Sequence, residues 1–166
     1  EGLYKPSKNQ DIDISFVGSA YGNRPYYIWR LLQSGVGLHL FGPGWQFNNT
    51  VSNLLRLYVA PIIYNFNFNE KKLHYLDKSM RSFIQKQIMN MTTVGGIPDD
   101  EEYSEILSRS LVSLNFPESR KDNDYLNYEV NFGCNFRDFE IPLSGSMLLT
   151  QDSEEFDFFY DRNKEA

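Results

Sequence analysis

The sequence predicts an α/β fold with a parallel sheet, and three observations support this prediction. Short runs rich in β-branched and aromatic residues alternate along the chain with stretches whose apolar residues recur at helical spacing. Two of the short runs stop abruptly at glycine, which ends a strand and starts a turn. With 166 residues, of which 16% are aromatic, the chain is large enough for one packed core. We therefore expect residues 1–166 to form a single domain.

The N-terminal part of the chain has the pattern of a strand, a helix and a second strand. Residues 12–17 form an apolar, β-branched run that stops at Gly18. Pro25 suits the first turn of a helix whose apolar residues share one face until Gly35 ends it. Residues 36–41 form the second strand. Because these elements make a βαβ unit, the connection should be right-handed and the strands parallel.

The range 48–92 interrupts this alternation. It contains a short helical pattern at 54–58, alternating aromatic and asparagine residues at 64–69, and a longer amphipathic helical pattern at 73–88. The alternating stretch is compatible with a strand or with an extended loop. We expect a helical insertion in this range.

The alternation resumes after the Gly95-Gly96 pair. Asp99 and Glu102 have the spacing of a capping box, which predicts the start of a helix. A strand at 111–116 and a polar loop at 119–124 follow this helix. The order of helix and strand again favours a parallel sheet.

The C-terminal part contains a short helical turn at 136–145, which ends on glycine and leads into an apolar strand at 147–150. Asp152, with Glu155 three residues later, then predicts the start of a helix at 154–160. The turn should therefore be joined directly to the sheet.

Charge and composition argue against several classes of function. The formal net charge is -6 and the pI is about 4.9, so no broad basic surface for nucleic acid is expected. The chain has no apolar run of about 18 residues and does not begin like a signal peptide, so we expect no membrane span. Its one cysteine, Cys134, excludes an intramolecular disulfide and is typical of the reducing cytoplasm. We expect a cytoplasmic location.

Open parallel sheets bind ligands at the carboxyl ends of their strands. The predicted loops at this edge are 18–24, 42–45, 116–120 and 136–145. In the first loop, Gly18 would let the backbone approach a ligand, helix N-terminal amides would favour an anion, and Arg24 would add a forked cation. The pattern describes a phosphate site in outline, or an ordinary strand-to-helix turn with a solvated arginine.

The last of these loops contains a second candidate site. Arg137 and Glu140 lie three residues apart on the predicted helical turn, so their side chains share a face. Glu140 could accept hydrogen bonds from both hydroxyls of a ribose, and Arg137 could face a diphosphate. The alternative interpretation is a surface ion pair at the start of a helix.

Metal and nucleophile chemistry have weaker candidates. Asp122-Asn123-Asp124 resembles the acidic triplet by which one class of sugar transferases holds a divalent metal. A solvated loop is the favoured interpretation, because Lys121 adjoins the triplet and no strand leads directly into it. We therefore expect no metal. His39 lies in a predicted buried strand and His74 on a predicted helix, without a second ligand at metal-binding spacing. Cys134 has no base nearby in sequence, so all three residues are expected to be structural.

Several motifs, taken together and in this order, resemble the CgeB-like (spore maturation protein) branch of the group 1 glycosyltransferases. They are residues 13–19, 40–45, 114–116, 137–145, 148–150 and the closing stretch at 154–165. The resemblance implies a two-domain GT-B fold, of which this chain would be the Rossmann-like C-terminal half that binds the nucleotide sugar. Because the chain lacks an initiator Met and ends just after a predicted helix, we expect a fragment of a longer protein.

The resemblance also implies an activity and a set of site residues. The reaction would move a sugar from a nucleoside diphosphate sugar to an unknown acceptor, which could be a glycan, a protein or a small molecule, without a bound metal or other cofactor. Arg24 and Arg137 would stabilise the leaving diphosphate, and Glu140 would hold the ribose. The implied donor-binding residues are Gly18, Ser19, Arg24, Arg137, Phe139, Glu140, Ser144 and Gly145.

The chain also departs from the family pattern. A second carboxylate would be expected eight residues before Glu140, where this sequence has Phe132, so another group must recognise the sugar ring. The range 48–92 has no counterpart. The N-terminal acceptor-binding domain, which would normally hold a catalytic base, is not part of this chain. The catalytic base is therefore unassigned, and this fragment should bind a donor without transferring sugar alone.

Two other classes of function compete with this interpretation. A non-catalytic α/β interaction module of the same derivation could use Tyr64, Phe66 and Phe68 to bind a partner, because aromatic residues are enriched at interface cores. Burial of these residues in the domain core is the alternative. A nicotinamide-dependent oxidoreductase is disfavoured because no Gly-x-Gly-x-x-Gly motif follows the first strand.

Overall fold

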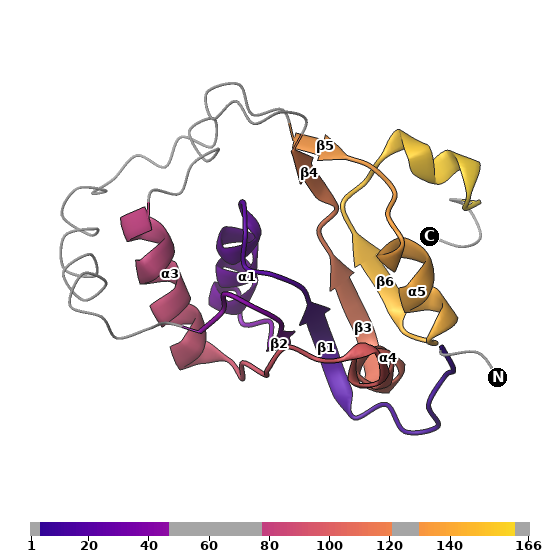
Figure 1. The fold of residues 1–166 in the computed structure, drawn as a ribbon, viewed down its shortest axis with the longest axis horizontal. Helices are drawn as coiled ribbons and strands as arrows, with labels where there is room; N and C mark the ends of the chain where they lie inside the picture. Colours follow the sequence, from indigo (N-terminus) through magenta and orange to yellow (C-terminus); the bar gives the residue numbers. More distant parts are fainter. Residues whose placement is uncertain (1–3, 47–77, 121–129, 162–166) are drawn as a thin grey trace.

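The structure is a computed structural model that describes residues 4–46, 78–120 and 130–161. Its centre is a sheet of four parallel strands in the order β2-β1-β3-β6 (Figure 1). These strands are β1 (Ile12–Val17), β2 (His39–Phe41), β3 (Ser110–Asn115) and β6 (Met147–Thr150). The parallel α/β class predicted from the sequence is confirmed, and the arrangement is consistent with a Rossmann-like domain.

The edge of the sheet at β2 differs from the prediction in two ways. Only His39–Phe41 pair as a strand, instead of residues 36–41, and His39 is exposed rather than buried. A further chain segment pairs in parallel with this strand, since Leu40 forms a bridge with Val94 and its N–H donates to the carbonyl oxygen of Thr93 at 3.1 Å. This additional pairing extends the sheet beyond β2.

One face of the sheet is covered by α1 (Arg24–Gln33) and α3 (Lys78–Met91), which lie side by side (Figure 1). The main core forms between these helices and the strands. Its fully buried members are Phe16, Ile28, Leu40, Trp45, Ile84 and Ile88. Helix α3 lies in the range expected to be an insertion, yet its isoleucines belong to the main core. The predicted helix at 54–58, the residues from Tyr64 to Phe68, and His74 lie outside the described residues.

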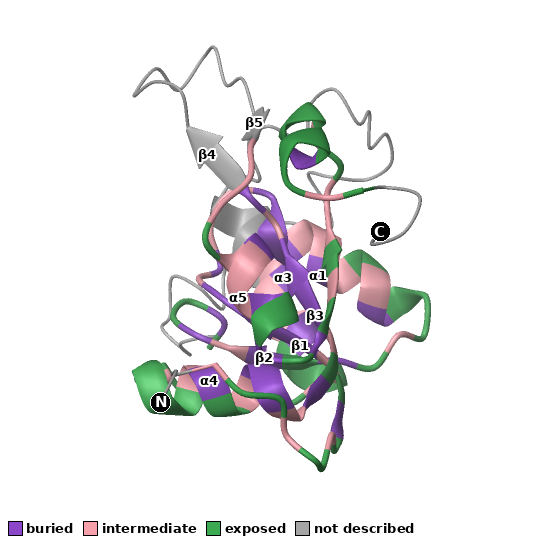
Figure 2. Cartoon of the chain, turned by 90° about the vertical axis from the view of Figure 1, so that its right-hand side faces the viewer, coloured by how far each residue is buried: buried purple, intermediate pink, exposed green. Residues whose placement is uncertain are grey.

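The opposite face is covered by α4 (Asp100–Arg109) and α5 (Arg137–Leu143), and Figure 2 shows the buried strands β1 and β3 at the centre of the molecule. Val17, Leu107 and Ile141 form a smaller apolar cluster here. The predicted capping box at the start of α4 is confirmed, because the Asp99 side chain accepts from the N–H of Glu102 at 2.9 Å. Helices thus flank the sheet on both sides.

Two segments differ from their predictions. Part of the expected polar loop at 119–124 belongs to a two-stranded antiparallel sheet of β4 (Glu118–Arg120) and β5 (Val130–Phe132). Polar composition does not predict this pairing, because it depends on a distant partner strand. Residues 121–129, including the Asp122 to Asp124 triplet, lie outside the described residues.

The expected helix at 154–160 is instead a short 3-10 turn, η2 (Glu154–Phe158). Its N-cap is Ser153, whose hydroxyl accepts from the N–H of Glu155, rather than Asp152. Phe156 is buried, whereas Phe158 and Phe159 are exposed. With few buried anchors, tertiary packing supplies little to extend this turn into an α-helix.

Within the described ranges, none of the helices has the length and apolar character needed to cross a membrane.

Replacing Ile88 by alanine should lower the free energy of unfolding by about 2–5 kcal/mol, because it opens a cavity in the main core. Met91→Ala on the same helix should change it by less than about 0.5 kcal/mol, since Met91 is exposed. Chemical denaturation followed by both circular dichroism and tryptophan fluorescence measures these values. A separate transition for α3, with an unchanged main transition in Ile88→Ala, would show that α3 folds independently.

Candidate functional site

The strand order creates a topological switch point at one edge of the sheet. The chain leaves β1 towards β2 on one side, whereas β3 pairs with β1 on the other side. The loops that follow β1 and β3 therefore diverge, and such a switch point is where open α/β sheets bind ligands. Gly18 follows β1 and Phe116 follows β3, so these two positions border the candidate site.

The Gly18 loop is held by contacts with the chain that follows β2. Gly18 N–H donates to the carbonyl oxygen of Phe41 at 2.8 Å, and Nε1 of the fully buried Trp45 donates to the Gly18 carbonyl oxygen at 2.6 Å. Gly42 has φ of 117°, and a Cβ there would lie 2.7 Å from that oxygen. Only glycine fits at position 42. The predicted loops 18–24 and 42–45 thus meet and brace each other.

Arg24 occupies a different place from the one expected for a residue that faces a diphosphate. It is only 4% exposed, and its guanidinium lies 3.9 Å from the centre of the Tyr21 ring. Its Nη2 donates to the carbonyl oxygen of Phe116 at 2.6 Å, and Nη1 to that of Ser19 at 3.4 Å. Arg24 therefore ties the loop after β1 to the end of β3.

The N-terminus of α1 also differs from an anion site. The Arg24 N–H donates to the carbonyl oxygen of Tyr21, and the Tyr26 N–H donates to that of Asn23. Pro25 has no N–H group to offer. The amides of this turn are therefore used within the chain and do not point to a ligand.

Arg137 lies beside Gly18 although the two are 119 positions apart in the sequence. A Cβ built on Gly18 would be 3.0 Å from Arg137 Nη1 and 2.9 Å from the Phe16 ring. Arg137 is half-buried. Among the described residues, its guanidinium makes no hydrogen bond or ion pair, so it is not in the surface ion pair considered with Glu140. At the switch point, the structure thus places a cation that has no carboxylate partner among the residues it describes.

The carboxylate of Glu140 lies one helical turn further along α5. Its Oε1 accepts from the hydroxyl of Tyr4 and its Oε2 from the hydroxyl of Tyr103, each at 2.8 Å. Burial and the nearby Glu140 carboxylate raise the pKa of Tyr4 to about 12, and the same causes raise the pKa of Tyr103. Arg137 opposes the shift at Tyr103, so Tyr103, Arg137 and Glu140 share one electrostatic environment.

Three further residues implied by the resemblance, Phe139, Ser144 and Gly145, have their contacts within α5 and with other parts of the chain. Phe139 packs on Phe159 and Tyr160, with ring centres 5.2 and 6.0 Å apart. Ser144 is fully buried, and its hydroxyl donates to the Glu140 carbonyl oxygen at 2.8 Å. Gly145 ends α5 with φ of 83°, at the amino edge of the sheet. These contacts support α5 rather than the switch point.

Sequence reasoning did not identify the groups that hold the start of α5. The buried Asp138 accepts from Asn115 Nδ2 at 2.7 Å and from the N–H of Asn135 at 2.8 Å. The Asn135 side chain in turn accepts from the N–H of Arg137 at 2.9 Å. A polar residue at the end of an apolar strand, Asn115, was the signal for this network.

Tyr4 and Tyr103 had no such signal, because their partner, Glu140, is distant in sequence.

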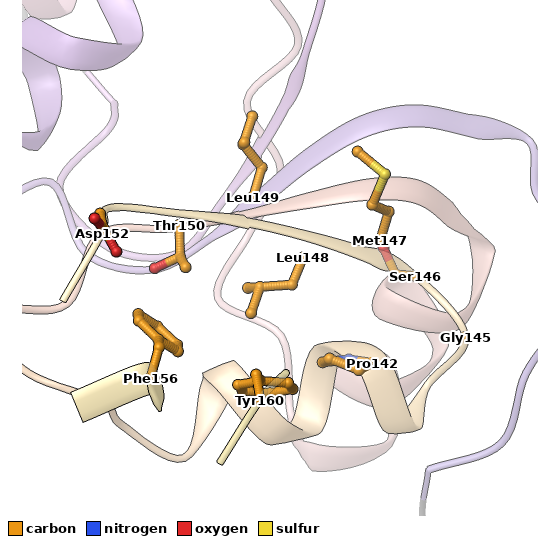
Figure 3. A pocket seen from close by; sticks show the side chains of 10 residues that line it. All are labelled: Pro142, Gly145, Ser146, Met147, Leu148, Leu149, Thr150, Asp152, Phe156 and Tyr160. Carbon is orange, nitrogen blue, oxygen red and sulfur yellow. The ribbon is translucent and has the colours of Figure 1, made fainter. Parts of the chain in front are cut away.

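A groove of about 910 Å³ runs along the exposed edge of the sheet, on β6 rather than at the switch point. Figure 3 shows Met147 and Leu149 pointing to one side of the strand and Leu148 pointing to the other, towards Tyr160. The described residues that line it are mainly apolar, and Asp152 is the charged one among them. Because none of these lining residues is a cation, the groove is a poor match for a diphosphate.

Neither a metal-binding group nor a sequence match helps to identify the ligand of this site. Within the described ranges, no group of three or more His, Cys, Asp or Glu residues could hold a metal ion. No protein-family model matches the chain, and a search of curated proteins found no sequence match.

Cys134 should react slowly with thiol reagents. Burial, together with the neighbouring Asp138 and Glu155 carboxyl groups, raises its pKa to about 11. At pH 8 the thiolate fraction should therefore be roughly 100-fold below that of a thiol with an ordinary pKa. Alkylation by iodoacetamide, with the guanidinium-unfolded protein as the control, measures this difference. Equal rates in the two states would contradict the assignment of Cys134 as an inert structural residue.

Stability should fall as the pH rises from 10 to beyond 12. The folded state raises the Tyr4 pKa above its unfolded value, so Tyr4 stabilises the protein below pH 10 and loses this contribution as the pH passes about 12. Tyr4→Phe should make the free energy of unfolding less dependent on alkaline pH, and Glu140→Gln should lower the pKa of both tyrosines. Tyrosinate absorbance and urea unfolding at each pH measure these effects. An unchanged tyrosine titration in Glu140→Gln would contradict this electrostatic link.

Proposed function

We propose that this chain is the nucleotide-sugar-binding domain of a glycosyltransferase with a GT-B fold, related to the CgeB-like branch. One observation carries the proposal: the guanidinium of Arg137, without a carboxylate partner among the described residues, lies beside Gly18 at the switch point of a parallel sheet. An unpaired cation at this position suits a ligand that carries negative charge.

The diphosphate of the donor binds at this cation. Gly18 has no side chain, so Arg137 Nη1 can lie close to the end of β1. Ser19 follows it and is partly exposed, and within the described part of the chain neither its N–H nor its hydroxyl is used as a donor. Both groups can donate to phosphate next to Arg137. Gly18 itself is not a donor, because its N–H is bound to Phe41.

The ribose binds at Glu140. Each carboxylate oxygen accepts one tyrosine hydroxyl, and a carboxylate has lone pairs for about four hydrogen bonds, so it retains capacity for the two ribose hydroxyls. Tyr4 and Tyr103 hold the carboxylate in a single orientation. Arg137 and Glu140 lie on the same face of α5, which matches the proximity of ribose and phosphate within a nucleotide.

In the proposed reaction, the bond between the anomeric carbon and a diphosphate oxygen breaks while the carbon becomes oxocarbenium-like. The diphosphate leaves with the bonding electron pair, and an acceptor hydroxyl forms the new bond and loses its proton. Arg137 stabilises the charge that develops on the leaving group. Arg24 acts indirectly by bracing the two loops. A separate acceptor-binding domain binds the acceptor and supplies the base that takes its proton. The reaction uses no resident metal. The protein works in the cytoplasm.

The second candidate is a non-catalytic interaction module derived from such a domain. The observation in its favour is the apolar groove along β6, which lies apart from Gly18 and has no counterpart in the donor-binding scheme. The residues Tyr64, Phe66 and Phe68, on which this alternative first depended, are outside the described ranges. A folded chain that binds no nucleoside diphosphate would favour this candidate.

Arg137→Ala should weaken binding of uridine, guanosine or adenosine diphosphate at least about tenfold, because a hydrogen bond to a charged group contributes about 1.5–3 kcal/mol. Arg30→Ala is the matched control, since Arg30 is exposed at the far end of α1 and should not change the affinity. Glu140→Ala should remove any preference for the ribonucleotide over its 2′-deoxy form. Titration calorimetry measures these affinities. Equal losses in Arg137→Ala and Arg30→Ala would contradict a specific role of Arg137.

A further inference from the structure

We infer that Asn135, held by Asn115 and Asp138, is a positioning residue that directs Arg137 towards the donor diphosphate, an inference that rests on the proposed function. Asn115 is the last residue of the central strand β3 and is fully buried. Its Nδ2 donates to Asp138 Oδ1 at 2.7 Å and to Asn135 Oδ1 at 3.1 Å. The end of β3 is therefore hydrogen-bonded to Asn135 and to Asp138, which lie on either side of Arg137 in the sequence.

The contacts within the turn complete a ring of hydrogen bonds. Asn135 N–H donates to Asp138 Oδ2 at 2.8 Å, and Asp138 N–H donates to the Asn135 carbonyl oxygen at 3.1 Å. The N–H of Arg137 donates to Asn135 Oδ1 at 2.9 Å. The Arg137 backbone is thus connected through one side-chain oxygen to the rigid sheet. Rotation of the turn relative to β3 would break several of these bonds together.

Helix α5 needs such an external anchor. It has seven residues, which is too few for a helix to be stable through its own hydrogen bonds. Its N-cap position, Phe136, makes no side-chain capping bond and is exposed. The Asn115 network therefore determines where the helix begins and how its first turn is rotated.

The free-energy cost of burying Asp138 indicates that this network does more than start a helix. Asp138 is fully buried, and burying a carboxyl group is costly unless several donors compensate it. A solvent-exposed cap would start a helix without that cost. The buried Asp138 carboxylate also fixes the orientation of the turn. Asp138 is hydrogen-bonded to Asn115 at the end of β3, and its neighbour Arg137 lies at Gly18. Because the backbone at Arg137 is fixed, its side chain starts from a defined position beside Gly18, and less freedom is lost when it binds phosphate.

A double-mutant cycle tests this inference. Asn135→Ala should weaken nucleoside diphosphate binding about tenfold when Arg137 is present and should have no further effect in the Arg137→Ala background. Asn135→Ser keeps a side-chain oxygen acceptor without adding a charge and should restore part of the affinity. The affinity for the nucleoside without phosphate should not change. Equal losses in both arginine backgrounds, or an equal loss of nucleoside binding, would overturn the inference, because they would indicate only general destabilisation.

Hydrogen exchange tests the positioning without a ligand. The Arg137 N–H should exchange about tenfold faster or more in Asn135→Ala than in the wild type, whereas Asn135→Ser should restore part of its protection. Unchanged exchange in Asn135→Ala would overturn the inference whatever the chain binds. If the folded wild type binds no nucleoside diphosphate, the proposed function fails and with it the role towards a diphosphate. The exchange result then decides only whether Asn135 orders the turn.

Discussion

Parallel pairing of β1 on both of its edges is the constraint on which the rest of the structure depends. A parallel neighbour requires a crossover, so the chain must pass over the sheet before β2 and again before β3. The helices that make these connections cover both faces and bury Phe16 on one side and Val17 on the other. The same pairing aligns the strand ends at one edge and separates the loops after β1 and β3. Every element of the candidate site is positioned by this geometry.

Small residues and short contacts then brace the loops at the switch point. Gly42 permits the loop after β2 to touch the Gly18 carbonyl, and Trp45 secures the same oxygen. On the other side, Asn115 at the end of β3 holds the first turn of α5. The site is therefore braced from two neighbouring strands. For the proposed anionic donor, preorganisation of this kind matters in a protein of net charge -6, because the overall field does not attract an anion and a local cation must do so.

The two arginines illustrate how burial separates a structural role from a proposed ligand-binding role. Both were candidates to face a diphosphate. The Arg24 guanidinium lies against the Tyr21 ring and donates to main-chain carbonyl oxygens, so it holds the neighbouring loops together. Arg137 is half-buried beside Gly18, without a carboxylate neighbour within bonding distance among the described residues. The apolar groove along β6 is a chemically different surface, so the two candidate functions can be tested separately.

The sequence by itself determined the parallel α/β class, the capping box at Asp99 and the strand before Gly18, because these features arise from local periodicity and turn chemistry. It also indicated Arg137 and Glu140 as a pair on one helical face. Only the tertiary structure decided that Arg24 is buried, that Val94 extends the sheet, and that Glu140 binds two tyrosine hydroxyls. The physical reason is distance along the chain: these contacts join residues that no local pattern connects, so they exist only after the sheet has assembled.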